Sequence, residues 1–310
     1  MDFRPSRIAI ISGMNRRNLL KSAGLAAGAA VLPPSVAQAQ SGGQRFKISL
    51  AQWSLHKAIF SRLITNLDFP RIAREQFGIE GLEFVNALWE APTHNYVQRL
   101  KQNMAKTGTK GVLIMVDGEG SMGHVDRAER MRATDNHRKW VDIAAELGCH
   151  SIRTNMYPGQ KQPSTPAEVT QFLEHCTESF TVLCEYAKKA NINVIIENHG
   201  GISSDPDVVV RLMKMVKAPN FGTLPDFGNF PKEMDKYQAV EKLMPYAKGV
   251  SMKCFDFTPD ARETTIDMDR MMKIVKASGY SGYIGIEYEG NRLTEFEGIQ
   301  AAKRCLERLI

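Results

Sequence analysis

The chain has 310 residues, of which 43% are hydrophobic and 24% charged, with a formal net charge of +6. This composition is ordinary for a soluble globular protein. Arginines and lysines are spread along the chain and form no block interleaved with aromatic residues, so the charge does not indicate nucleic-acid binding. The five cysteines are odd in number and include no CxxC pair, which argues against a disulfide framework and a zinc–thiolate site.

The N-terminal segment carries three features of a twin-arginine signal peptide in the correct order. Arg16 and Arg17 precede a run rich in Ala, Gly and Leu, and Ala37-Gln38-Ala39 then forms a small-x-small cleavage pattern. The run is too short, and too rich in Ala and Gly, for a transmembrane helix. We therefore predict a signal peptide at residues 1–40 and a mature domain at residues 41–310 without a membrane span. The twin-arginine export machinery would carry it, already folded, to the periplasm.

From Lys47 onward, apolar runs of strand length alternate with amphipathic runs of helical length. Strands are predicted at 47–52, 81–85, 111–117, 151–154, 193–197, 222–225, 249–253 and 283–287. Helices are predicted at 68–76, 95–107, 125–147, 166–189, 205–216, 237–245, 267–278 and 292–309. Alternation of this kind predicts a parallel sheet, and eight strand–helix pairs predict closure into a single (β/α)8 barrel of roughly 250 residues.

Polar residues gather at the carboxyl ends of the predicted strands, where barrels of this kind build their active sites. The fifth strand ends in Glu197-Asn198-His199, the sixth leads into Asp226, and the eighth ends at Glu287. Three carboxylates at one rim would repel each other strongly unless a cation neutralises them. Carboxylates favour hard ions, so we predict a divalent metal ion, Mn²⁺ or Mg²⁺, with Co²⁺ or Zn²⁺ as alternatives.

These motifs resemble those of the xylose isomerase-like TIM barrels, a family of sugar phosphate isomerases and epimerases. The family includes hydroxypyruvate isomerases, ketose 3-epimerases and inosose dehydratases. The resemblance covers residues 47–310 and rests on Ile196-Glu197-Asn198-His199, Pro225-Asp226-Phe227-Gly228-Asn229 and Gly285-Ile286-Glu287-Tyr288-Glu289. It implies that Glu197 and Glu287 are both metal ligands and the acid–base pair, and that Asp226 is a third ligand.

The chain departs from the family in the seventh strand. Where the family has a histidine ligand two residues before a lysine, this chain has Ser251 before Lys253. A serine hydroxyl is a poor ligand and a charged lysine cannot bind a metal, so the fourth ligand is left open between His199 and water. Two further alternatives are that the metal binds only weakly and that Lys253 takes over the role of the ion. We expect Lys253 to be a catalytic cation that binds a substrate oxygen or balances charge, with a neutral base as its alternative role.

The resemblance implies a metal-dependent isomerase or epimerase of a sugar or small hydroxy-carbonyl compound. One glutamate would remove the proton next to the carbonyl to give an enediolate, and the other would return it. The residues expected to bind the carbohydrate are Trp53, His56, His150, Arg153 and Asn229. One alternative is a lyase or dehydratase that expels a β-leaving group from a keto-sugar or a 3-keto-glycoside. Another is a sugar-binding barrel without catalysis. Whether the protein is a homo-oligomer is left open.

Replacing Arg16 and Arg17 together with lysine should block export and leave the fold unchanged, because both residues precede the predicted domain. Cell fractionation and mass measurement of the wild type should find a periplasmic chain that begins near Gln40. Full-length wild-type protein in the cytosol would contradict the prediction.

Overall fold

A computed structural model describes residues 45–310, so the predicted signal peptide and its cleavage site lie outside the described residues. Within the described residues, no helix is both long enough and apolar enough to cross a membrane.

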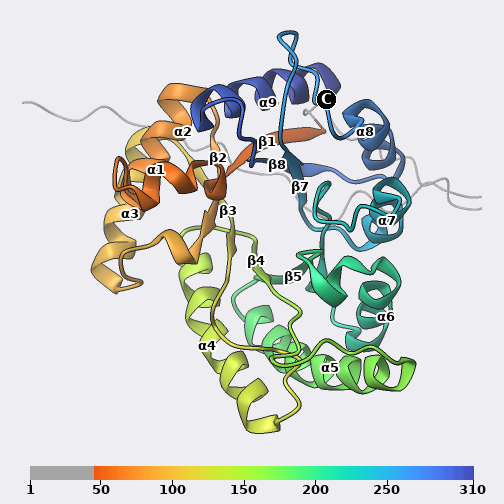
Figure 1. Cartoon of the computed structure of the whole chain (residues 1–310). Helices are drawn as coiled ribbons and strands as arrows, with labels where there is room; N and C mark the ends of the chain where they lie inside the picture. The colour runs from red at the N-terminus through yellow and green to blue at the C-terminus, as the bar shows by residue number, and fades with distance from the viewer. Residues whose placement is uncertain (1–44) are drawn as a thin grey trace, which may run out of the picture. The chain divides into compact units, whose positions relative to one another are not determined.

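The domain contains a sheet of eight parallel strands. The strands lie at its centre (Figure 1). They are β1 (Phe46–Ala51), β2 (Gly81–Val85), β3 (Lys110–Met115), β4 (Ser151–Thr154), β5 (Asn193–Glu197), β6 (Phe221–Leu224), β7 (Val250–Cys254) and β8 (Gly282–Tyr288). Neighbouring strands pair in the order β6-β5-β4-β3-β2-β1-β8-β7. Two isolated parallel bridges, Thr223 with Ala247 and Asp226 with Ser251, join the β6 side to the β7 side. The predicted (β/α)8 TIM barrel is therefore confirmed.

Helices surround the strands on the outside of the barrel (Figure 1). They are α1 (His56–Phe60), α2 (Phe69–Phe77), α3 (His94–Thr107), α4 (Arg127–Glu146), α5 (Pro166–Lys188), α6 (Pro206–Val216), α7 (Lys236–Leu243), α8 (Met268–Ala277) and α9 (Glu295–Leu309). Short 3₁₀ turns lie at Gln52–Leu55, Asn66–Asp68, Asn86–Leu88, Gly201–Ser204 and Met244–Tyr246. Helix α1 was not predicted, because five residues are too few to show a helical period.

Capping side chains set where several helices begin. Helix α5 starts after Thr165, whose hydroxyl accepts a hydrogen bond from the backbone N–H of Glu168, and the Glu168 carboxylate accepts one in return. The same reciprocal pair, Thr294 with Glu297, starts α9 at Glu295. The predicted start of this helix, residue 292, is three residues too early, because the capping pair ends the preceding loop at Thr294.

Alternate strand positions fill the barrel interior with apolar side chains, among them Val85, Leu113, Ile195 and Leu224. Successive side chains of a strand point to opposite faces, so a residue two positions further along points to the same face. Glu197 lies two positions after Ile195, and Asp226 lies two positions after Leu224. The acidic residues therefore continue the inward-facing rows at the carboxyl end of the barrel.

One carboxyl group lies inside this apolar interior, that of Glu83 in β2, which is 1% exposed. Its Oε1 accepts a hydrogen bond from Ser49 Oγ at 2.6 Å, and its Oε2 has no partner among the described residues. The carboxyl packs against the backbone of β8, where a Cβ on Gly285 would lie 2.4 Å from both oxygens. Burial raises the pKa of Glu83 to about 8, so this group is mostly protonated at neutral pH.

Glu83→Gln should make the free energy of unfolding less sensitive to pH. Between pH 5 and 8 the folded protein keeps a proton on Glu83 that the unfolded chain has lost, so wild-type stability falls as pH rises. A neutral amide does not titrate, so the variant should not lose stability in this way. Its free energy of unfolding should therefore rise relative to that of the wild type as the pH approaches 8. A pKa rise from 4.5 to about 8 sets an upper limit of about 5 kcal/mol for the gain.

Urea unfolding of both proteins at pH 5, 6.5 and 8 would measure this gain. Glu233→Gln, the same change at an exposed position, is the control and should follow the wild type. A difference between Glu83→Gln and the wild type that does not change with pH would contradict the assignment of a protonated carboxyl.

Candidate active site

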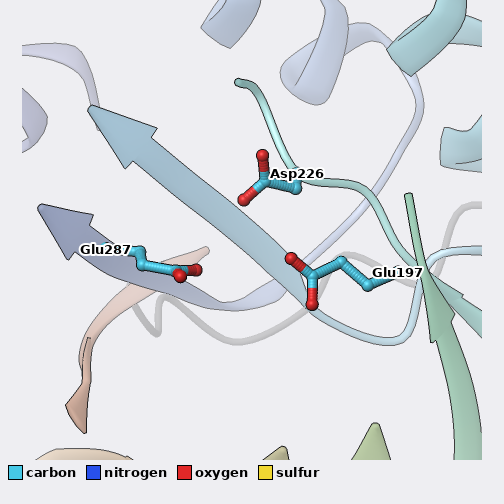
Figure 2. Close-up of side chains that lie close together, drawn as sticks. All are labelled: Glu197, Asp226 and Glu287. Atoms are coloured by element: carbon cyan, nitrogen blue, oxygen red, sulfur yellow. The ribbon is translucent and has the colours of Figure 1, made fainter. Parts of the chain in front are cut away.

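Three carboxylates converge at the carboxyl end of the barrel, as Figure 2 shows. Glu197 is the last residue of β5, Asp226 follows β6, and Glu287 lies in β8. One oxygen from each lies within 4.8 Å of the others, and all three residues are buried. The sequence analysis expected these three residues to meet, and the structure brings them together.

Asn198 fixes the backbone of Asp226. Its Nδ2 donates to the Asp226 carbonyl at 3.0 Å, and its Oδ1 accepts from the Asp226 N–H at 2.8 Å. Asp226 Oδ1 in turn accepts from the backbone N–H groups of Gly228 and Asn229, each at 2.8 Å. The Asn229 side chain reaches back and donates to Glu197 Oε1 at 3.0 Å. This network holds Asp226 beside Glu197 and leaves Asp226 Oδ2 for other partners.

Ser251 of β7 lies between two of the acids. Its Oγ is 2.8 Å from Asp226 Oδ2 and 3.0 Å from Glu287 Oε2. A hydroxyl has one hydrogen to donate, so it can satisfy only one of these two oxygens. The other contact requires a proton on a carboxyl group or a cation close by.

Lys253, two residues further along β7, is 2% exposed and contacts two carboxylates. Its Nζ lies 3.3 Å from Glu287 Oε1 and 3.2 Å from Glu289 Oε1. Burial opposes the charged amine, but Glu287 and the other acids nearby, Asp226, Glu197 and Glu289, outweigh burial and raise the pKa of Lys253 above its ordinary value. These contacts favour the charged form of the Lys253 amine.

Arg153 of β4 also serves two carboxylates. Its Nε lies 2.8 Å from Glu197 Oε2, although the two atoms are not aligned for a hydrogen bond. Its Nη1 donates to Asp117 Oδ1 at 2.7 Å, and the Asn155 amide donates to the same oxygen. Arg153 is buried, whereas the Asp117 side chain is 31% exposed, so this pair extends from the acidic cluster toward solvent.

Four carboxylates, those of Asp117, Glu197, Glu287 and Glu289, thus pair with two cations, and the Asp226 carboxylate lies beside Glu197 and Glu287 as a fifth. The excess of negative charge is costly in a buried site. Burial raises the pKa of Glu197 and of Asp226 to about 7, with the neighbouring cations opposing it. Burial also acts on Glu287, but Lys253 and the Ser251 hydroxyl outweigh it and lower that pKa.

A divalent cation fits these donors. Glu197, Asp226 and Glu287 offer three carboxylate oxygens at short mutual distances, and Glu197 Oε2 has no hydrogen-bond partner among the described residues. With the Ser251 hydroxyl they make a donor set of oxygen alone, which hard cations such as Mg²⁺ prefer.

His199 lies apart from this ligand group. Its Nδ1 is 3.1 Å from the Tyr157 hydroxyl, and its backbone N–H donates to Ser203. Burial lowers the pKa of His199, so its ring is neutral at pH 7. No sequence pattern marked Tyr157, because it lies in an irregular loop after β4.

The remaining residues expected to bind substrate fall at two ends of the barrel. Trp53 and His56 follow β1 and stack on each other with ring centroids 4.6 Å apart. His150 directly precedes β4, and its Nδ1 contacts Ser151 Oγ at 2.7 Å. It is therefore at the amino end of the strand, and the prediction that it orients a sugar beside Arg153 does not fit this position. The sequence analysis gave no role to Asp117 or Asn198, although both follow strand ends.

The comparison with protein families agrees with this description of the fold. A model described as "Xylose isomerase-like TIM barrel" matches residues 71–309. The chain belongs to this family. No curated protein sequence matches the chain.

Among solved structures, the D-allulose 3-epimerase from Methylomonas sp. has a TM-score of 0.69 and 13% identity over 86% of this chain and 99% of its own. The IOLI protein "with a binding zinc atom" has a TM-score of 0.68 and 14% identity over 85% of this chain and 97% of its own. The probable 3-DHS dehydratase AsbF from Bacillus anthracis has a TM-score of 0.61 and 17% identity over 84% and 98%. Sugar epimerases recur among the matched structures. At these identities the likeness shows the fold.

Ser251→His should tighten the binding of Mn²⁺ or Co²⁺ by roughly tenfold or more, because an imidazole is a far better donor to these ions than a hydroxyl. The gain should be small for Mg²⁺, which prefers oxygen. Because Lys253 opposes a cation, the double variant with Lys253→Met should show the larger gain. Calorimetric metal titrations would measure these affinities, with Ser251→Ala as the control that removes the hydroxyl without adding a nitrogen. No tightening in either histidine variant would mean that residue 251 does not reach the ion.

Proposed function

We propose that this protein is a metal-dependent isomerase or epimerase of a sugar or small hydroxy-carbonyl compound, acting through an enediolate intermediate. The observation that carries the proposal is the convergence of Glu197, Asp226 and Glu287 from three different strands, with more carboxylates than cations in a buried site. The recurrence of sugar epimerases among the matched folds is consistent with it.

Glu197, Asp226 and Glu287 would hold the divalent cation, Mn²⁺ or Mg²⁺ by the chemistry of their oxygens. When bound, the cation supplies Lewis acidity that polarises a carbonyl and its neighbouring hydroxyl. His199 lies apart from these three acids, so the Ser251 hydroxyl or a water molecule is the better candidate for the fourth ligand.

Glu197 and Glu287 would be the acid–base pair. One removes the proton from the carbon next to the carbonyl, and the other returns a proton to the opposite face or to the neighbouring carbon. Asn229 and Arg153 hold Glu197 in place, whereas Ser251 and Lys253 hold Glu287. These contacts would hold each carboxylate in one orientation, which is a condition for efficient proton transfer to a bound substrate.

Lys253 and Arg153 would stabilise the negative charge that develops on the substrate oxygens, since both are buried cations beside the acids. Trp53 and His56 would bind the sugar from the loop after β1, at the carboxyl end of the barrel. We also propose that the enzyme works in the periplasm after export, on the pattern of its first 40 residues.

Glu197→Gln and Glu287→Gln should each lower the turnover rate by roughly a hundred- to ten-thousand-fold, because the amide keeps the shape and removes the base. Each change should also weaken metal binding, since it removes one negative charge from the ligand group. Glu233→Gln, at an exposed position after β6, is the control and should leave both properties unchanged.

A panel of free keto-sugars and keto-glycosides, with products identified by NMR, would provide the assay. Interconverted sugars of unchanged composition support the isomerase or epimerase, whereas release of a leaving group would make the protein a lyase instead. Near-normal rates in either glutamine variant would move the catalytic pair elsewhere, with Lys253 and Glu289 as the first candidates.

A further inference from the structure

A cavity of about 460 Å³ lies among the loops that follow β1 and β2. Apolar side chains line much of it: Ile59, Phe60, Ile64, Leu88 and Trp89. Because these loops leave the carboxyl ends of their strands, the cavity is at the same end of the barrel as the acidic cluster. Its volume is in the range of sites that bind small organic molecules.

Two residues that line the cavity also pack in the apolar interior of the barrel. Leu88 belongs to the same buried cluster as Ala51 and Val85, and both Ile59 and Trp53 pack against that cluster. Strand β1 also pairs directly with β8, the strand that carries Glu287. The cavity and the acidic cluster are therefore at the same end of the barrel, and the residues after β1 lie between the cavity wall and the strand next to β8.

Aromatic rings lie at the cavity. The Phe60 ring stands edge-on to Trp53, with centroids 6.1 Å apart, and also edge-on to His56 at 6.4 Å. Edge-to-face arrangements of this kind are the ones that an added aromatic ring can extend. Trp89 is packed by other aromatic residues and is 9% exposed, so it forms part of the cavity wall.

The last residue of α1 and the loop after it present apolar side chains to solvent. Phe60 is 60% exposed and Leu63 is 79% exposed, and they are two of the three large exposed hydrophobic residues in the described part of the chain. Backbone hydrogen bonds from Arg62 to Ile59 and from Leu63 to Ala58 hold the loop in this shape. Arg62 itself has a φ of 61°, a left-handed conformation that a side-chain-bearing residue rarely adopts.

We propose that this cavity is a subsite for the aglycone of a glycoside substrate, and that the aglycone is aromatic. The proposal rests on the proposed function, because it names the substrate class of that same site. A free sugar carries hydroxyl groups around its whole ring and gains little from a cavity of this composition. An aryl glycoside has a polar sugar for the acidic cluster and a flat apolar ring for the cavity, where burial removes apolar surface from water.

The test measures binding of two unreactive probes, phenyl and methyl glucopyranoside of the same anomer, by calorimetry on the metal-loaded enzyme. The phenyl glycoside should bind at least about tenfold tighter, the equivalent of one well-packed aromatic contact. Phe60→Ser should reduce the affinity for the phenyl probe to that for the methyl probe. Val125→Ser, the same kind of change at the third exposed hydrophobic residue, should keep the preference.

Equal affinities of the two probes in the wild type would overturn the proposal, and so would an equal loss in Phe60→Ser and Val125→Ser. Phenol that binds as tightly as the phenyl glycoside would also overturn it, because the sugar would then contribute nothing. Light scattering that finds a dimer of the wild type and a monomer of Phe60→Ser would assign this face to a second copy of the chain instead.

The outcome is separable from that of the proposed function. Binding of the probes involves no turnover, so a phenyl preference would stand even if Glu197→Gln kept full activity. Turnover of free sugars by the wild type, with no phenyl preference, would leave the proposed function in place and remove the aglycone subsite.

Discussion

The site depends on holding several carboxylates close together in a place from which water is largely excluded. Glu197, Asp226 and Glu287 would repel each other in such surroundings, and Lys253 and Arg153 are each shared with a further acid. The barrel imposes this proximity, because its parallel strands bring their carboxyl ends to one place. A bound divalent cation would replace this repulsion with attraction between each carboxylate and the ion.

The contacts between Asp226 and Ser251 both close the barrel and belong to the acidic site. Strands β6 and β7 meet through isolated bridges, and one of these bridges joins Asp226 to Ser251. The side chains of the same two residues are hydrogen-bonded at 2.8 Å. A cation bound to Asp226 and Glu287 would therefore also link the β6 side of this junction to the β7–β8 side. Metal binding would then be expected to stabilise the folded barrel.

Much of the fold and the centre of the site could be predicted from the sequence, because both follow from local patterns. Short β-branched runs such as Val194-Ile195-Ile196 mark the strands, and the acids directly after them mark the site. The prediction that His150 binds substrate is wrong because His150 precedes its strand. A residue before a strand lies at the amino end of the barrel, whereas the acidic site lies at the carboxyl end. The double contacts of Arg153 and Ser251 join strands that are distant in sequence, so no local pattern predicts them.

The measurement that tests the central claim most directly is the metal content of the purified protein after equilibration with Mn²⁺, compared with that of Asp226→Asn. Asp226 is a ligand in this account and is not assigned to proton transfer, so the variant isolates metal binding from catalysis. The account predicts one Mn²⁺ per chain in the wild type and much weaker binding in Asp226→Asn. Wild-type protein that binds no divalent ion would contradict it, and would mean that protons, Lys253 and Arg153 neutralise the acids by themselves.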